Sequence, residues 1–314
     1  MGATRLEKPM ILKFQASEDA STRPAPGNLF IVGCLLPALT VVLLLFGGGL
    51  LLGVLQGLGY FPGVGDDTFT GEHFRNVLTD ADFLASLGLT LYISLTSTLI
   101  AVVLSIGMAL MLMQLSARMQ WLHFLFQIPL VIPHLVVAIT VILLVAPTGL
   151  FSRIAQVMGL IETSSGFPLL VNDRFGLGII LAYVWKEIPF ITLMIFSVLR
   201  NAGGMELLDV GKTLNATRWQ RFRYILWPMI FPSLTAASLI VFAYTFGAFE
   251  VPFLLGQTYP MTLPVLAYKH YADVDLMARP EGIATGIIIA CIVALSIVIS
   301  QVSVRLAKQR GGLL

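Results

Sequence analysis

The sequence has 314 residues, of which 57% are hydrophobic and only 11% are charged, and its mean hydropathy is +0.89. An ordinary soluble domain carries about 25% charged residues, so this composition excludes that class and indicates an integral membrane protein. The net charge of +2 is too small to indicate a nucleic-acid-binding protein. Both cysteines lie in apolar stretches, which argues against a disulfide framework or a CxxC metal site.

Six apolar stretches are each long enough to cross the bilayer as a helix, which requires about 20 residues. They cover residues 29–60, 83–114, 122–147, 176–199, 224–256 and 282–304. The sequence therefore predicts an all-α integral membrane protein with six transmembrane helices. The predicted transmembrane domain is residues 29–306, between an N-terminal segment of residues 1–28 and a tail of residues 307–314. The first stretch far exceeds a secretory signal's apolar region of about 7 to 15 residues, so we expect it to be retained.

The distribution of Lys and Arg predicts the orientation of these spans. Six spans place both termini on one side of the membrane. Thirteen basic residues lie on that side and five on the other. Because basic residues accumulate in short cytoplasmic segments, both termini are predicted to be cytoplasmic.

Catalytic and metal-binding motifs are absent from the sequence. There is no GxxxxGK[ST] phosphate loop, so we expect any ATP hydrolysis to occur on another subunit. The four histidines lack the spacing of metal ligands, and the serines of the second span have no neighbouring His or Asp partner. We therefore predict a chain that is not an enzyme and that binds no cofactor or metal itself.

The fourth span contains two adjacent charges, Lys186 and Glu187. Each costs about 2.5–3.5 kcal/mol at the bilayer centre, so neither is expected to face lipid. Pro189 removes a backbone donor there, and such a residue opens a helix where the freed carbonyls face protein or a water-filled cavity. Glu250, near the outer end of the fifth span, is a further carboxylate for the same site.

Together these residues are a candidate translocation pathway for a cation, with cation–π contacts from aromatic side chains. The candidate set is Trp185, Lys186, Glu187, Tyr244, Phe249 and Glu250. Pairing of Lys186 with Glu250, or with backbone groups, in a purely structural role is an alternative that the sequence leaves open.

The loop of residues 200–223 is predicted to form two short helices joined by a turn. The first covers Glu206–Leu214, with Glu206 and Asp209 near its start, where the helix dipole favours negative charge. Its apolar or small face consists of Leu207, Val210, Gly211 and Leu214, which recur at helical spacing.

The turn after this helix has its own local signals. Asn215 is suited to the left-handed conformation that ends a helix. Thr217 and Gln220 match a capping box, which predicts that a second helix begins there and leads into the fifth span. Trp219 and Phe222 lie on the apolar side of this second helix.

At these residues the chain resembles the permease subunits of binding-protein-dependent ABC importers, whose cytoplasmic loop has the pattern EAAxxLGAS followed by W, F and LP. Asp209-Val210-Gly211 stands for Glu-Ala-Ala, and Leu214-Asn215-Ala216-Thr217 stands for Leu-Gly-Ala-Ser. The resemblance covers about residues 83–304. Asn215 in place of Gly should preserve the turn, whereas the Val and Gly in place of the two Ala residues should loosen the contact with a partner.

The resemblance implies a type I permease fold, a location in a bacterial inner membrane and a complex of defined composition. Its other members would be a second permease subunit, identical or related, two ABC ATPase subunits that bind ATP and Mg²⁺, and an external substrate-binding protein. The loop would then couple to the ATPases through Glu206, Asp209, Val210, Gly211, Leu214, Asn215, Ala216 and Thr217.

Residues 247–256 resemble the GEFxxPxLLGG stretch of the polyamine (spermidine/putrescine) type, a group close to ferric-iron and sulfate systems. A polyamine-like cation is therefore the favoured substrate, and sulfate-like anions, ferric iron and small organic solutes remain open. An ion-coupled secondary transporter is the main alternative, since it would also use intramembrane charges. Such a transporter would need no ATPase-docking helix. Secondary transporters often contain internal repeats, and this sequence shows no convincing repeat.

Overall fold

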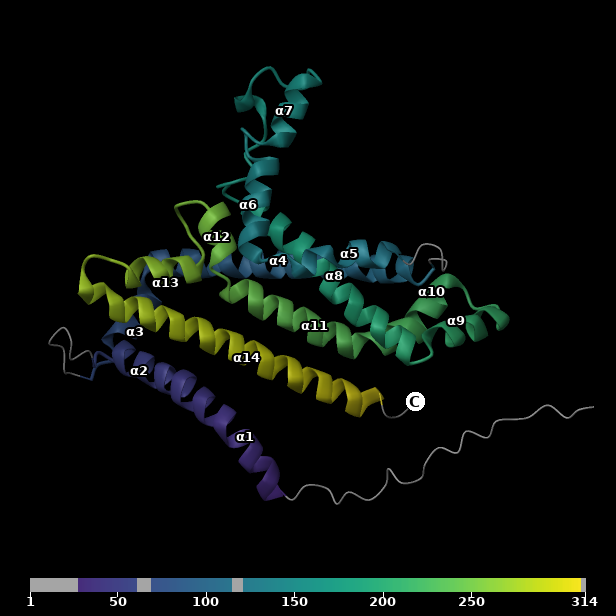
Figure 1. Ribbon diagram of the computed structural model, residues 1–314, viewed down its shortest axis with the longest axis horizontal. Coiled ribbons are helices and arrows are strands. Elements are labelled where there is room, and N and C mark those ends of the chain that lie inside the picture. Colours follow the sequence, from purple (N-terminus) through teal and green to yellow (C-terminus); the bar gives the residue numbers. More distant parts are fainter. Residues whose placement is uncertain (1–27, 61–68, 115–120, 312–314) are drawn as a thin grey trace, which may run out of the picture. The chain divides into compact units, whose positions relative to one another are not determined.

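The computed structural model describes residues 28–60, 69–114 and 121–311 (Figure 1). The predicted N-terminal segment, apart from Asn28, and residues 312–314 of the predicted tail lie outside the described residues. The regular structure of the described part is helical, and six of its helices are long and apolar enough to cross a membrane. This result confirms the predicted fold class.

The chain divides into two units, residues 1–51 and 52–314. The described part of the first unit contains α1 (Asn28–Val42), a π-helical turn η2 (Leu43–Gly47) and the start of α2 (Gly48–Gly57). Its side chains are apolar and, from Val32 onward, almost all exposed, as expected for a helix that meets lipid or another subunit.

Four long helices form the centre of the second unit: α4 (Ala81–Leu112), α8 (Leu177–Asn201), α11 (Trp227–Gly247) and α14 (Arg279–Gly311). Helix α4 packs against α8 and α11, and α11 packs against α14 (Figure 1). The buried face of α4 is rich in small residues, which allow close approach between membrane helices. These are Ser86, Thr90, Ser94, Ser97, Ala101, Ser105 and Ala109.

The third predicted span is not one continuous helix. It is broken into α5 (Trp121–Val131) and α6 (His134–Val145). Pro133 causes the break, because it has no N–H to donate to the carbonyl of Pro129 and its ring clashes with that turn. The membrane-spanning helix is instead formed from α6 onward, over His134–Val157, and includes α7 (Leu150–Val157). The predicted opening of the fourth span at Pro189 is wrong, because α8 runs without interruption from Leu177 to Asn201 with Pro189 inside it.

The fifth predicted span ends earlier than expected. After α10 (Arg218–Arg221) and the π-helical turn η6 (Phe222–Leu226), α11 stops at Gly247, and a separate short helix, α12 (Glu250–Leu255), follows. Pro252 explains this break, since a proline in the first turn of a helix needs no hydrogen bond, whereas inside a continuous helix it would break one.

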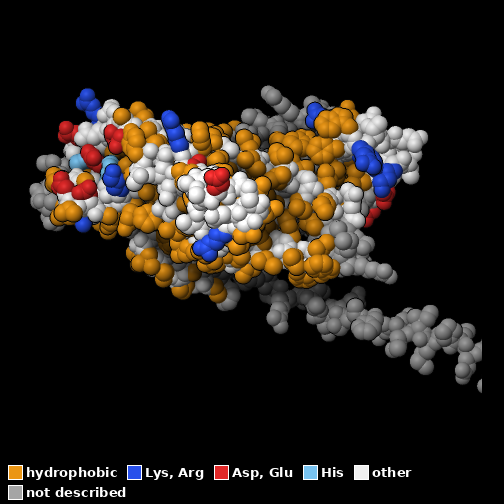
Figure 2. All heavy atoms as spheres, turned by 90° about the horizontal axis from the view of Figure 1, so that it is seen from above, with side chains coloured by type: hydrophobic (Ala, Val, Ile, Leu, Met, Phe, Trp, Pro, Cys, Tyr) orange, Lys and Arg blue, Asp and Glu red, His pale blue; other side chains and the backbone are white. Residues whose placement is uncertain are grey.

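The remaining described elements are short and connect the long helices. They are α3 (Glu72–Thr79), the 3₁₀ turns η5 (Ser164–Gly166) and η7 (Leu276–Ala278), α9 (Gly204–Thr213) and α13 (Leu263–Tyr271). Figure 2 shows that hydrophobic side chains cover much of one face and that charged side chains gather in separate groups. This distribution suits helices that cross an apolar layer and end in water.

Candidate functional site

The two short helices predicted in the loop are present as α9 and α10, and we call residues 204–221 the elbow. Helix α9 ends in a Schellman motif at Asn215, whose φ of 54° is left-handed as predicted. The Ala216 N–H donates to the Gly211 carbonyl at 3.0 Å, and the Asn215 N–H donates to the Lys212 carbonyl at 3.0 Å. Together these bonds satisfy carbonyls that a helix end would leave without partners.

The capping box at the start of α10 is also confirmed. The Gln220 N–H donates to Thr217 Oγ1 at 3.2 Å, and the Thr217 N–H donates to Gln220 Oε1 at 2.8 Å. The caps of the two helices lie within a few residues of one another, so the turn between them is fixed by the local sequence. The elbow is therefore a rigid corner.

The predicted apolar face of α9 is divided between two environments. Leu207, Val210 and Leu214 are exposed, at 45%, 55% and 76% of their surface. Gly211 is buried against α10 and η6, where a Cβ would lie 3.0 Å from Arg221 Cγ and 3.1 Å from Ile225 Cδ1. Gly211 therefore belongs to an inner contact and does not share one face with the three exposed residues, as the sequence pattern predicted.

The other predicted coupling residues surround this exposed face. Glu206 is exposed in the first turn, and the exposed Asp209 carboxylate accepts a hydrogen bond from Lys212 Nζ at 2.6 Å. The elbow is also attached to the membrane helices, because Leu208 packs against the core that contains Leu199 of α8, and Phe222, which directly follows the elbow, packs against the same core. A movement of α9 would therefore be transmitted to α8 and α11.

The Lys186 ammonium does not face an open pathway. It donates three hydrogen bonds, all to backbone carbonyls at the end of α5: Pro129 (2.7 Å), Leu130 (3.1 Å) and Ile132 (2.5 Å). These are carbonyls that the break at Pro133 leaves without helical partners. Of the alternatives left open by the sequence, the structure contains the pairing with backbone groups.

Glu187 lies in a different environment, beside the start of α6. Its Oε1 is 3.3 Å from His134 Nε2, and the His134 ring lies 4.4 Å from the Tyr244 ring, measured between centroids. The Glu250 carboxylate is exposed and lies near enough to Tyr244 and Tyr183 for its charge to act on both side chains. We call Glu187, His134, Tyr244 and Glu250 the polar cluster.

Two functional candidates were missed at the sequence level. His134 follows the Ile-Pro-Leu-Val-Ile-Pro segment, 53 positions before Glu187, and no spacing rule connects the two. Tyr183 is fully buried and its hydroxyl has no hydrogen-bond partner. Its position one helical turn before Glu187 is the only sequence signal for it.

The other predicted pathway aromatics are Phe249 and Trp185. Phe249 packs on Phe253 and Tyr268, each at 4.9 Å between ring centroids. Trp185 is 44% exposed. Among the described residues, no group of three or more His, Cys, Asp or Glu could hold a metal ion.

Residues 101–310 match the family model described as "Binding-protein-dependent transport system inner membrane component". The chain belongs to this family. The permease is therefore a multi-pass inner-membrane transport component and not an enzyme, in agreement with the resemblance at the elbow.

Individual relatives support this assignment. The permease is 27% identical over 219 residues to the inner membrane ABC transporter permease protein YnjC of Escherichia coli (strain K12), covering 66% of this chain and 39% of YnjC. It is 25% identical over 209 residues to the molybdenum transport system permease protein ModB of Azotobacter vinelandii, covering 66% of this chain and 88% of ModB.

The fold is similar to that of a solved bacterial ABC transporter involved in the import of the acidic polysaccharide alginate. The TM-score is 0.74 at 18% sequence identity, over 88% of this chain and 95% of the other. This likeness confirms the predicted permease fold. ModB and the alginate transporter are named for different substrates, so the comparisons do not select the polyamine type.

Proposed function

We propose that the permease forms the translocation pathway of an ATP-driven importer. The complex would contain two permease subunits, identical or related, two ABC ATPase subunits carrying ATP and Mg²⁺, and an external binding protein that delivers the solute. The observation that carries this proposal is the exposed apolar face of α9. Three large apolar side chains on a rigid helix outside the membrane spans indicate a surface that another protein covers.

The construction of the elbow suits transmission of force from the ATPases. Its two helices are capped by local hydrogen bonds, and its inner side packs against the ends of α8 and α11. A partner that displaces α9 would move these helices as connected bodies and so open the pathway to one side or the other. For this coupling the elbow, and with it both termini, would lie in the cytoplasm.

A small organic cation, such as a polyamine, is the proposed substrate class. The positive charge of Lys186 is held by three carbonyls, whereas Glu187 and Glu250 remain as carboxylates of the polar cluster. The cluster is therefore acidic. It contains the Tyr244 ring, which packs on His134, and the unpartnered hydroxyl of Tyr183 belongs to a neighbouring side chain. Such groups favour a cation over an oxyanion.

The proposed function is tested with variants that should insert into the membrane but no longer couple ATP hydrolysis to solute uptake. Val210→Glu and Ala216→Glu place a charge on or beside the exposed face of α9, and we expect both variants to insert normally but to lose solute-stimulated ATPase activity and uptake. Leu160→Glu is the matched control, since Leu160 is 71% exposed but lies far from the elbow in the chain. Wild-type ATPase stimulation in both elbow variants would refute the proposal.

A further inference from the structure

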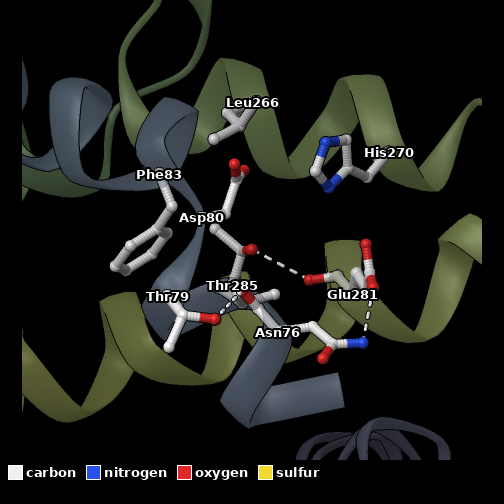
Figure 3. A pocket seen from close by; sticks show the side chains of 9 residues that line it. Asn76, Thr79, Asp80, Phe83, Leu266, His270, Glu281 and Thr285 are labelled. Carbon is white, nitrogen blue, oxygen red and sulfur yellow. Dashed lines mark hydrogen bonds between the residues drawn. The ribbon is translucent and has the colours of Figure 1, made fainter. Parts of the chain in front are cut away.

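A separate cavity lies among α3, α13, and the starts of α4 and α14, and we call it the α3–α14 pocket (Figure 3). Its volume is 360 Å³, within the range of small-ligand sites. It contains none of the residues of the elbow or of the polar cluster. Figure 1 places these elements at the opposite end of the second unit from α9.

Two carboxylates line the α3–α14 pocket, and each is fixed by the fold. Asp80 is the N-cap of α4, and its Oδ1 accepts a hydrogen bond from the Asp82 N–H at 3.2 Å. Glu281 lies in the first turn of α14, and its Oε1 accepts a hydrogen bond from Asn76 Nδ2 at 3.4 Å. Figure 3 shows His270 of α13 across from Glu281.

Gly282 allows α13 and α14 to approach closely enough to form this arrangement. A Cβ at this position would lie 2.7 Å from the Tyr271 nitrogen and 2.8 Å from the Ala267 oxygen, both backbone atoms. The close contact holds His270 next to Glu281. His270 Nδ1 is buried without a hydrogen-bond partner, so polar groups beside the α3–α14 pocket are incompletely satisfied.

The negative charge of the α3–α14 pocket is only partly compensated. Its two carboxylates contribute two negative charges, and each of the two helix N-termini contributes about half a positive charge. About one negative charge therefore remains uncompensated. The nearest basic side chain in sequence, Arg279, instead lies over the Tyr271 ring, 5.6 Å from its centroid, and lines a different cavity.

We propose that the α3–α14 pocket binds a monovalent organic cation, an alkylammonium or alkylguanidinium group. The charged head lies between Asp80 and Glu281, where it accounts for the remaining negative charge. Phe83 and Leu266 are covered side chains at the floor of the cavity, at 1% and 2% exposed, so the apolar stem lies toward the open side of the pocket. A metal ion fits less well, because the described residues provide no group of three metal-ligating side chains.

The site is independent of the proposed transport function, since binding requires only this chain. The same cationic group occurs on a free amine and on a Lys or Arg side chain of another protein. A free amine would make the pocket a solute site outside the polar cluster. A side chain would make it a recognition site for a protein that meets this end of the permease.

The experiment measures binding of n-butylammonium to the full-length chain in phosphatidylcholine nanodiscs by saturation-transfer NMR, with empty nanodiscs as the blank. We expect saturable binding, and we expect 1-butanol, which has no charge, not to bind. Because the polar cluster is itself proposed to take a cation, the pocket variants are measured in a chain that also carries Glu187→Gln. In that chain Glu281→Gln should weaken binding by about tenfold or more, the effect of losing a charged hydrogen-bond partner. Asp80→Asn should act in the same direction, since Asn retains the capping function.

Glu72→Gln is the matched control, because Glu72 is an exposed acid on α3 that does not line the pocket, and its binding should equal that of the wild type. Thermal unfolding of each variant checks that the fold is intact. Absence of saturable binding, equal binding of 1-butanol, or wild-type affinity in Glu281→Gln would each overturn the proposal.

A second probe, N-acetyl-lysine amide, distinguishes the two sources of the cation. If it binds as tightly as n-butylammonium, the pocket accepts a side chain presented on a peptide backbone. If only n-butylammonium binds, the pocket selects a free amine. Either result supports a cation site and identifies its source.

Discussion

The elbow and the break between α5 and α6 both interrupt a helix, but they satisfy the freed backbone groups in different ways. In the elbow, the caps at Asn215 and Thr217 come from residues no more than five positions apart. At the break, the carbonyls are satisfied by Lys186, which is 54 to 57 positions away. A helix interruption whose backbone groups are satisfied by nearby residues can therefore be predicted from the sequence. An interruption whose carbonyls are satisfied by a distant side chain can be recognised only once the fold is known.

The largest expected effect comes from removing that distant partner by Lys186→Met. Three carbonyls then lose a donor, at about 1–3 kcal/mol each, whereas removal of the buried ammonium recovers only about 2.5–3.5 kcal/mol. We expect the free energy of unfolding to fall by about 3 kcal/mol, measured by denaturation of the purified permease. Lys212→Met removes an exposed ammonium, and its effect should stay within about 1 kcal/mol. Equal stability of Lys186→Met and the wild type would contradict the capping role.

The corresponding change in the elbow is Asn215→Ala. An L residue other than Gly or Asn pays about 1–2 kcal/mol in the left-handed conformation, so the variant should be less stable by about that amount. Asn215→Gly is the control and should be as stable as the wild type or slightly more so. If Asn215→Ala and Asn215→Gly were equally stable, the positive φ would not be what holds this turn.

Glu187→Gln tests the charge of the polar cluster apart from its hydrogen bonds, because the amide can still bond to His134. We expect the KM for uptake of a cationic solute to rise about tenfold, a difference of about 1.4 kcal/mol. ATPase activity without solute should not change. An unchanged KM would show that the Glu187 carboxylate does not contact the transported cation.

The smallest expected effect is that of Thr217→Ala, which removes one side of the capping box. Loss of an N-cap of this kind costs about 1 kcal/mol. Thr217→Ser retains the hydroxyl and should restore most of the stability, as measured by the same denaturation experiment. Equal loss in both variants would mean that the Thr217 methyl group, and not its hydroxyl, stabilises the elbow.

The sequence predicted the features that depend on composition or on nearby residues. The six spans follow from apolar length, and the positive φ of Asn215 and the capping box of Thr217 follow from side-chain chemistry at fixed spacing. It did not predict which proline breaks a helix. Pro133 lies at a break, while Pro189 is accommodated inside α8, where α4 packs against it, and that difference is set by tertiary contacts.

The polar cluster was predicted only in part for the same reason. Lys186 and Glu187 were recognised because charges in an apolar stretch are conspicuous. Their partners are backbone carbonyls and a histidine more than 50 positions away, and neither has a sequence signal of its own. The split of the α9 face was also hidden, because Gly211 is placed by its contact with Arg221 and Ile225 of the next elements.

Photo-crosslinking from α9 identifies what covers its exposed apolar face in the assembled transporter. A benzophenone amino acid is placed at Val210 in membranes that contain the assembled transporter, with Leu160 as the control position. We predict a crosslink from Val210 to an ATPase subunit and no such crosslink from Leu160. Crosslinking of Val210 to lipid alone, in a complex that retains ATPase activity, would contradict it.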